Sequence, residues 1–234
     1  MRLSAYPTFG AVPRDIGVDL ALVIDTLRMT SVAATAFSNG CARMLAVETI
    51  EEARTLADRY GALAGGERGG LRVDGFDLGN SPLEYTARRV SGRSIVVTTT
   101  NGTRAVARVK CARNVWLASL LNADAVAERI RESGFADVAL VCAGTAGRFS
   151  MEDALTAGAI ASRLGDEREA DDFTLACKIL YRALARDIRG AMAGSEHAGR
   201  LLRLGFAGDL DYCAREGTLK SVPALGGDGW FTSA

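Results

Sequence analysis

Four short apolar runs in this chain each end in a cluster of charged, hydroxyl and glycine residues, and this repetition limits the possible folds more than any other feature. The clusters are Asp25–Ser31, Gly65–Gly70, Thr98–Thr103 and Cys142–Asp153. Segments with helical periodicity separate them, and strands that alternate with helices predict a largely parallel α/β sheet. Because the carboxyl ends of parallel strands meet at one edge of a sheet, we expect the clusters to gather around one ligand.

Apolar periodicity divides the chain into elements. Strands are predicted over 16–25, 43–48, 62–65, 93–99, 114–118 and 137–142 (the last clear strand), and helices over 50–60, 102–109, 122–133, 151–164 and most of 171–215. Gly65–Gly70 is expected to be a loop, Ser81 and Glu84 to cap a helix start, and 222–229 to be irregular surface chain. The predicted fold is α/β with three layers: a mostly parallel mixed sheet, helices on both faces and a helical C-terminal third.

Domain organisation follows from the absence of a linker rich in proline, serine or charge. We expect one domain over 1–234, with 165–220 as a helical sub-region that packs on the core or caps the site. Apolar helical stripes would also suit a homodimer.

Charge and composition exclude several classes of function. The 28 basic residues balance the 28 acidic ones, so the chain has no electrostatic footprint for nucleic acid or an anionic membrane surface. No run reaches the ~18 apolar residues of a membrane span, and the N-terminus lacks the apolar stretch of a signal peptide. Five scattered cysteines without a C-x-x-C pair favour a reducing cytoplasm.

Histidine usage restricts the metals that the chain can bind. His197 is the only histidine, which excludes multi-histidine sites. A bound metal would need oxygen ligands, and these favour Mg²⁺ or Mn²⁺. Because no nucleophile-elbow motif surrounds His197, we expect a structural or substrate-facing role for it rather than a catalytic triad.

The first two clusters supply candidate catalytic acids and arginines. Asp25 ends a buried strand and could hold Mg²⁺ or activate water, while Arg28 could fork onto a phosphate or sulfonate. Alternatively, Asp25 caps the next helix and pairs with Arg28. Glu67 could bind a metal or accept a proton from water, and Arg68 could bind an anionic substrate. Alternatively, the segment is a solvated turn. Asp77 is a reserve acid or a turn-former.

The last two clusters resemble anion cradles, since glycines and hydroxyls lie where a strand gives way to a helix. The candidate substrate-binding residues are Thr99, Thr100, Asn101, Gly102 and Thr103 in one cluster and Gly144, Thr145 and Arg148 in the other. Asp153, with Glu152 in reserve, would ligate the metal beside Asp25 and Glu67. The alternative is that Ser150 caps the helix, and that Glu152 and Asp153 are there because the helix dipole favours acids in the first turn.

Taken in this order, these blocks resemble the 2-phosphosulfolactate phosphatase family. The similarity covers Asp25–Arg28, Gly66–Gly70, Gly75–Glu84, Thr98–Ala105 and Cys142–Gly158, and more weakly Glu196–Cys213. Gly-Phe-Asp-Leu-Gly-Asn-Ser-Pro and Thr-Asn-Gly-Thr are the specific blocks. One departure is Met29–Val32, where the family has a threonine-rich run.

The resemblance implies Mg²⁺-dependent hydrolysis of a small anionic phosphate ester, 2-phosphosulfolactate, to 3-sulfolactate and phosphate, a step of coenzyme M biosynthesis. Asp25, Glu67 and Arg28 would be catalytic, and direct attack by water is preferred to a phosphoenzyme on Asp25. Two alternatives stay open. One is a phosphosugar isomerase or transferase, and the other is a non-catalytic binder of acidic metabolites.

Overall fold

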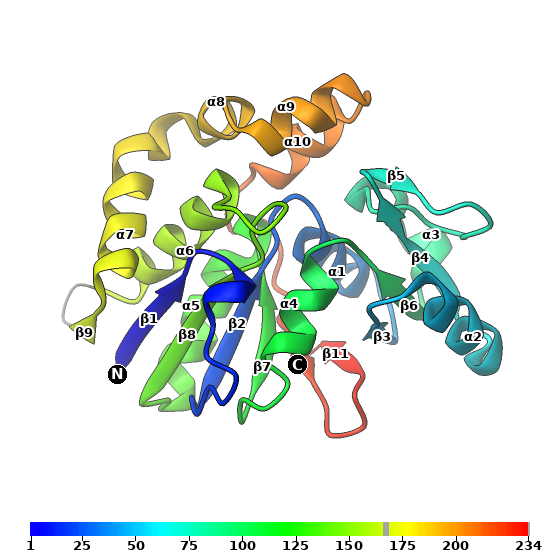
Figure 1. The fold of residues 1–234 in the computed structure, drawn as a ribbon, viewed down its shortest axis with the longest axis horizontal. Coiled ribbons are helices and arrows are strands. Elements are labelled where there is room, and N and C mark those ends of the chain that lie inside the picture. The colour runs from blue at the N-terminus through cyan, green and yellow to red at the C-terminus, as the bar shows by residue number, and fades with distance from the viewer. Residues whose placement is uncertain (166–168, 234) are drawn as a thin grey trace.

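The computed structural model describes residues 1–165 and 169–233 and confirms the predicted α/β class, with helices on both faces of one sheet (Figure 1). The strands are β1 (Arg2–Tyr6), β2 (Leu20–Ile24), β3 (Arg43–Ala46), β4 (Leu63–Arg68), β5 (Leu71–Arg72), β6 (Ser94–Thr98), β7 (Val115–Ala118), β8 (Asp137–Cys142), β9 (Glu169–Ala170), β10 (Pro223–Leu225) and β11 (Phe231–Ser233). The helices are α1 (Met29–Ser38), α2 (Ile50–Tyr60), α3 (Ala87–Val90), α4 (Gly102–Arg108), α5 (Ala123–Ser133), α6 (Met151–Arg163), α7 (Asp172–Leu184), α8 (Ile188–Ala193), α9 (Glu196–Arg203) and α10 (Ala207–Cys213).

Strand β2 shows why the sheet is covered on both sides. Its side chains alternate between faces, and all of them are buried. Ala21 and Val23 belong to a core shared with α1 and α4. Leu22 and Ile24 belong to a second core shared with α5, α6 and α7. A strand that is apolar on both faces is typical of a parallel sheet between helical layers.

The C-terminal hairpin joins two groups of parallel strands. The sheet order is β5-β4-β6-β3-β11-β10-β7-β2-β8-β1-β9. Strands β3, β4 and β6 pair in parallel, as do β7, β2, β8 and β1. Between them, β7 with β10, β10 with β11, and β11 with β3 are antiparallel. The prediction of an irregular tail over 222–229 is therefore wrong for Pro223–Leu225, although 226–229 do form an exposed turn, and 137–142 is not the last strand. The hairpin strands are too short to show a period in sequence.

Two further local predictions are wrong. Gly65–Arg68 continues strand β4 rather than forming a loop, because parallel pairing with β6 extends as far as Gly66 opposite Thr98. Ser81 precedes a 3₁₀ turn over Pro82–Glu84 without capping it by its side chain, which donates instead to Asp209. Strand β1, which pairs in parallel with β8, was not predicted.

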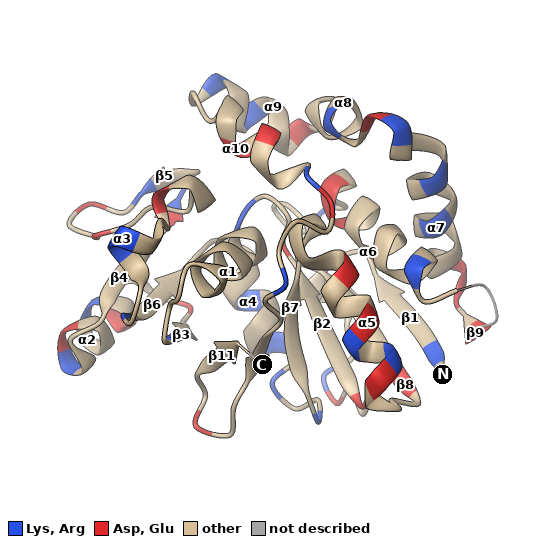
Figure 2. Ribbon diagram, turned by 180° about the vertical axis from the view of Figure 1, so that it is seen from behind, with Lys and Arg blue, Asp and Glu red and all other residues tan. Residues whose placement is uncertain are grey.

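The helical C-terminal third packs over the edge where the site lies. Residues of α8, α9 and α10 form one apolar cluster with Leu27, Leu120 and Leu155. This cluster anchors α9 beside the loop that follows β2. Acidic and basic residues are interspersed along α5, whereas the charged residues along α7 are mainly basic (Figure 2). Within the described residues, no helix is both long and apolar enough to span a membrane.

Candidate active site

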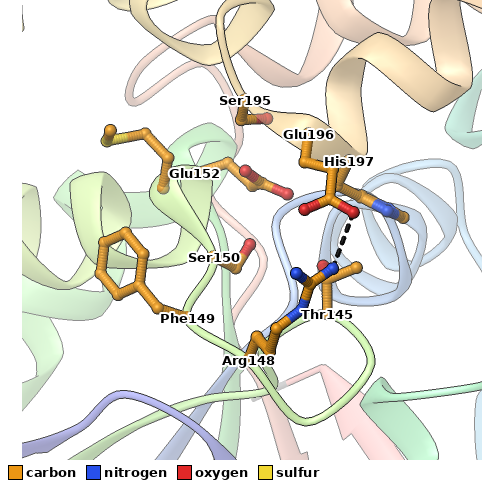
Figure 3. Close-up of a pocket in the computed structure, with 9 residues that line it drawn as sticks. Thr145, Arg148, Phe149, Ser150, Glu152, Ser195, Glu196 and His197 are labelled. Carbon is orange, nitrogen blue, oxygen red and sulfur yellow. Dashed lines mark hydrogen bonds and ion pairs between the residues drawn. The ribbon is translucent and has the colours of Figure 1, made fainter.

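All four polar clusters contribute to one small cavity, which confirms that they meet. This first cavity, of about 100 Å³, is lined by Asp25, Leu27, Arg28, Glu67, Gly69, Gly70, Asn80, Thr100, Asn101, Thr145, Ala146, His197, Arg200 and Leu201. A second cavity, of about 300 Å³, is lined by Thr145, Arg148, Phe149, Ser150, Met151, Glu152, Ser195, Glu196 and His197 (Figure 3). Thr145 and His197 line both, so the two cavities adjoin.

Asp25 lies at the end of β2 and is buried, with 7% of its surface exposed. Burial raises the pKa of Asp25 to about 6; His197 opposes the rise, while Glu67 adds to it. The peptide N–H of Met29 also favours its charged form. A carboxylate held this far from water is unfavourable unless a cation or a proton offsets its charge.

Glu67 ties two of the clusters together. Its Oε2 accepts a hydrogen bond from the Gly70 N–H at 2.7 Å, and its Oε1 accepts one from the Thr100 N–H at 2.8 Å. The side chain is 7% exposed and lines the first cavity. Since a carboxylate has about four lone-pair sites, Glu67 keeps acceptor capacity toward the cavity.

Asp153 likewise links two loops through backbone N–H groups. It accepts from the N–H of Thr26 at 2.9 Å and from that of Gly144 at 3.0 Å, which joins the ends of β2 and β8. Burial, together with Asp25 and Glu152, raises the pKa of the Asp153 carboxyl. Asp153 does not line either of the two cavities.

Glu152 is the acid with free oxygens. It is 1% exposed and lines the second cavity, and both its carboxylate oxygens lack a hydrogen-bond partner in the described part of the chain. Buried carboxylates usually have partners. The arrangement therefore favours a positively charged group, or a hydrogen-bond donor, beside Glu152.

Arg28 lies at the cavity wall but is largely engaged by the protein. Its Nη1 is 2.6 Å from Oδ2 of Asp209, its Nη2 donates to the Gly70 carbonyl, and its guanidinium lies over the Phe206 ring. Arg28 and Asp209 are both 2% exposed. The pair links the loop after β2 to α10, whereas the sequence suggested Asp25 as the partner of Arg28.

Several predicted substrate-binding residues lie outside the two cavities. Arg68 turns away and donates to the carbonyls of Glu67 and Glu48 and to the Thr98 hydroxyl. Thr99 and Thr103 bond to each other at the start of α4. The Gly144 N–H is taken by Asp153. Asp77, the reserve acid, accepts from the Ala64 N–H as a turn residue.

Of the remaining predicted residues, all but Gly102 line the cavities. Thr100 and Asn101 line the first, Thr145 lines both, and Gly102 packs against Oδ2 of Asp25. Arg148 lines the second cavity, where it forms an exposed ion pair with Glu196 at 2.7 Å, the dashed line in Figure 3. Exposed pairs of this kind contribute only ~0–1 kcal/mol, so Arg148 is easily released to another anion.

Sequence reasoning missed Arg200, Asn80 and the partner role of Asp209. Arg200 lines the first cavity and donates to the Gly69 carbonyl at 3.0 Å. It lies one helical turn after His197 on α9, and residues three apart share a helix face. The spacing of three residues from His197 is the sequence feature that could have identified Arg200 as a cavity residue.

Gly102 allows a direct test of how closely Asp25 is held. A Cβ atom on Gly102 would overlap Oδ2 of Asp25 and lie 2.7 Å from Cβ of Met29. Gly102→Ala is expected to lower kcat by about 10²-fold and stability by about 1–3 kcal/mol. The matched control is Gly10→Ala, where the nearest atom, Oγ1 of Thr8, is 3.7 Å away. Equal activity of the two variants would contradict the close packing.

The donor set fits a hard cation. Asp25 and Glu67 are buried carboxylates that line the first cavity, and oxygen donors suit Mg²⁺. No group of three or more His, Cys, Asp or Glu residues forms a ready-made metal cluster in residues 1–165 and 169–233. Mg²⁺ commonly uses one or two carboxylates and completes its shell with water and phosphate. A two-carboxylate site is compatible with both observations.

Comparison with known proteins agrees with this arrangement of residues. The family model described as 2-phosphosulpholactate phosphatase matches residues 8–228. A "probable 2-phosphosulfolactate phosphatase" of Caldanaerobacter subterraneus is 42% identical over 96% of this chain and 95% of its own length. Proteins of the same description from Clostridium acetobutylicum and Thermotoga maritima are 42% and 43% identical, over 87% and 88% of this chain and 88% of each relative. The chain therefore belongs to the 2-phosphosulpholactate phosphatase family.

Proposed function

We propose that this protein is a Mg²⁺-dependent phosphatase that hydrolyses a small acidic phosphate ester, with 2-phosphosulfolactate as the first substrate to test. The observation that carries the proposal is the first cavity. Two buried carboxylates, Asp25 and Glu67, face it together with Arg28 and Arg200. Acids and arginines in one small cavity suit a dianionic phosphate with a divalent cation. The family of phosphoric monoester hydrolases to which the chain belongs supports the same reaction class.

Each group has a distinct role in this proposal. Asp25 and Glu67 would hold Mg²⁺, which supplies charge stabilisation for the phosphoryl oxygens when bound. Asp25 would also orient the attacking water, and Arg200 and Asn101 would bind phosphate oxygens. Asp153 keeps the loops around Asp25 in place through the N–H groups of Thr26 and Gly144, so we assign it to positioning rather than to the metal.

The substrate's acidic substituent has a natural place in the second cavity. Arg148 lines it beside the hydroxyls of Thr145 and Ser150. A planar guanidinium forks onto carboxylate or sulfonate oxygens. This would let the protein distinguish esters that carry such a group from simple alkyl phosphates.

The test is phosphate release from racemic 2-phosphosulfolactate, phospholactate and phosphoglycerate, each with Mg²⁺ and with EDTA. We expect release that requires Mg²⁺ and is fastest with the sulfonated ester. Faster release from another ester would keep the phosphatase and change the substrate. No release from any ester, with the ligands still raising the melting temperature, would favour a non-catalytic binder or an enzyme that retains the phosphate.

A further inference from the structure

The second cavity combines buried and exposed polar side chains. Ser150 and Glu152 are 5% and 1% exposed, whereas the side chains of Arg148 and Glu196 are 66% and 75% exposed. All four residues line the cavity (Figure 3). Arg148 lies in the loop between β8 and α6, and Glu196 lies in the first turn of α9. A ligand that enters the cavity from solvent therefore has access to both Arg148 and Glu196.

The binding of an acidic substituent in this cavity depends on Arg148. Of the described residues that line the second cavity, Arg148 is the one arginine or lysine, and Glu152 and Glu196 are both acidic. Carboxylates repel an anion, whereas a guanidinium binds carboxylate and sulfonate oxygens. In the structure, Nη2 of Arg148 is 2.7 Å from Oε1 of Glu196. A carboxylate of the protein thus holds the place beside Arg148 that an acidic substituent would take.

This ion pair can be exchanged at low cost. Because both side chains are mostly exposed, the pair contributes little to stability, and Glu196 regains water when it is displaced. The backbone of Arg148 is held, since its N–H donates to the Thr145 carbonyl at 3.0 Å and its carbonyl accepts from the Thr145 N–H at 2.9 Å. The exchange therefore needs movement of the two side chains alone.

We propose that Glu196 is a specificity-determining residue that competes with the acidic substituent of the substrate for Arg148. This inference rests on the proposed function. When the ester binds, its sulfonate or carboxylate replaces Glu196 at the guanidinium, and when the acidic alcohol leaves, Glu196 pairs with Arg148 again. Glu196 therefore weakens the binding of esters and alcohols that carry an acidic group. The consequence is easier release of the acidic product.

Other roles of Glu196 make different predictions. An acid in the first turn of a helix is stabilised by the helix dipole, and Glu196 occupies such a position on α9. That role alone would leave the affinity for esters unchanged. A role in holding Arg148 ready for the substrate would weaken the affinity once Glu196 is removed. Competition instead requires that removal of the negative charge strengthens the binding of acidic esters.

The test measures ester affinity in Glu196→Gln. Glutamine keeps the side-chain length and an oxygen that accepts from Arg148 but removes the negative charge. The probes are 2-phosphosulfolactate and glycerol 2-phosphate. Both have a three-carbon skeleton with phosphate on the central carbon, and the second has hydroxymethyl groups in place of both acidic substituents. The readout is KM, or the inhibition constant of an ester that is not cleaved. We expect the constant for 2-phosphosulfolactate to fall about two- to fivefold and that for glycerol 2-phosphate to change less than about 1.5-fold.

Arg148→Gln separates competition from simple charge repulsion. This variant is expected to raise the constant for 2-phosphosulfolactate by about tenfold or more, because a charge-assisted contact is lost. In the same background, adding Glu196→Gln should have no effect, since the group for which Glu196 competes is absent. An equal fall in both backgrounds would indicate repulsion and overturn the proposal. An unchanged or higher constant in Glu196→Gln alone, or an equal fall for glycerol 2-phosphate, would also overturn it.

Asp211→Asn is the matched control. It removes the charge from another exposed ion pair, that of Asp211 with Arg189 at 2.9 Å, and neither residue lines either of the two cavities. Both ester constants should stay as in wild type. If wild type releases no phosphate from either ester, the proposed function fails. Calorimetric dissociation constants of the same esters, for wild type and the variants of Arg148 and Glu196, would then still decide whether Glu196 competes.

Discussion

Replacing Asp25 by asparagine is expected to abolish phosphate release while making the metal-free protein more stable. Asp25 is one of the two buried acids that line the first cavity. Its removal deletes both a Mg²⁺ ligand and the group that orients water, so kcat should fall by at least about 10²- to 10⁴-fold. The amide is neutral, so it carries no desolvation penalty of the kind that the carboxylate has.

The stability gain should depend on pH in a defined direction. Burial raises the pKa of Asp25 from 3.8 to about 6. A raised carboxyl pKa means that the folded state binds a proton more tightly than the unfolded state does. The stabilisation of the folded state by this tighter proton binding is complete below about pH 4 and is lost as the pH rises through about 6. Metal-free wild type should therefore lose up to about 3 kcal/mol relative to Asp25→Asn over that window.

Urea unfolding in EDTA at several pH values measures this difference. Asn101→Ala, a second change in the same cavity that leaves all carboxylates in place, is the control and should follow the wild-type pH dependence. A constant difference between wild type and Asp25→Asn from pH 4 to pH 7 would contradict the raised pKa.

Breaking the buried Arg28–Asp209 pair is expected to have the largest effect on stability. Both side chains are 2% exposed. Arg28→Met leaves Asp209 with the Ser81 hydroxyl but without its counter-charge. Removing one partner of a buried pair typically costs about 3–5 kcal/mol, whereas replacing both by apolar groups costs far less. The double variant Arg28→Met/Asp209→Leu should therefore recover most of the loss.

Urea unfolding of the two single variants and the double variant measures the coupling. Arg189→Met removes an ion pair with Asp211 whose side chains are about half exposed and should cost only about 0–1 kcal/mol. If Arg28 also binds the phosphate, the double variant will be stable but inactive. Additive losses in the double variant would contradict the pairing seen in the structure.

Long periodic elements were predictable from sequence because local patterning determines them. Helix α2 begins and ends as predicted at Ile50 and Tyr60, where a Thr49 cap and Gly61 in the left-handed region mark its limits. Strand β8 also matches its predicted bounds. The β10–β11 hairpin was missed because its three-residue strands are defined by partners far away in the chain.

The meeting of the four clusters was also predictable, but the reason given for it was incomplete. Three antiparallel pairings separate the strand that ends before Asp25 from the strands that end near Glu67 and Thr98. A shared parallel edge therefore cannot alone bring them together. The contact of Gly102, at the start of α4, with Asp25 and Met29 completes the explanation.

Side-chain roles within the clusters could not be predicted, because sequence spacing does not show which hydrogen-bonding groups are already paired. Glu67 and Asp153 both use their oxygens to bind peptide N–H groups, and only Glu67 lines a cavity. Arg68 turns toward backbone carbonyls. His197 needed the Leu27 carbonyl, far away in the chain, to fix its ring.

The most direct measurement of the central claim is calorimetric titration of Mg²⁺ into wild type, Asp25→Asn, Glu67→Gln and Asp153→Asn, with inorganic phosphate present. We expect one Mg²⁺ site in wild type, its loss in Asp25→Asn and Glu67→Gln, and its retention with weaker affinity in Asp153→Asn. Unchanged Mg²⁺ binding in both Asp25→Asn and Glu67→Gln would show that the first cavity is not the metal site.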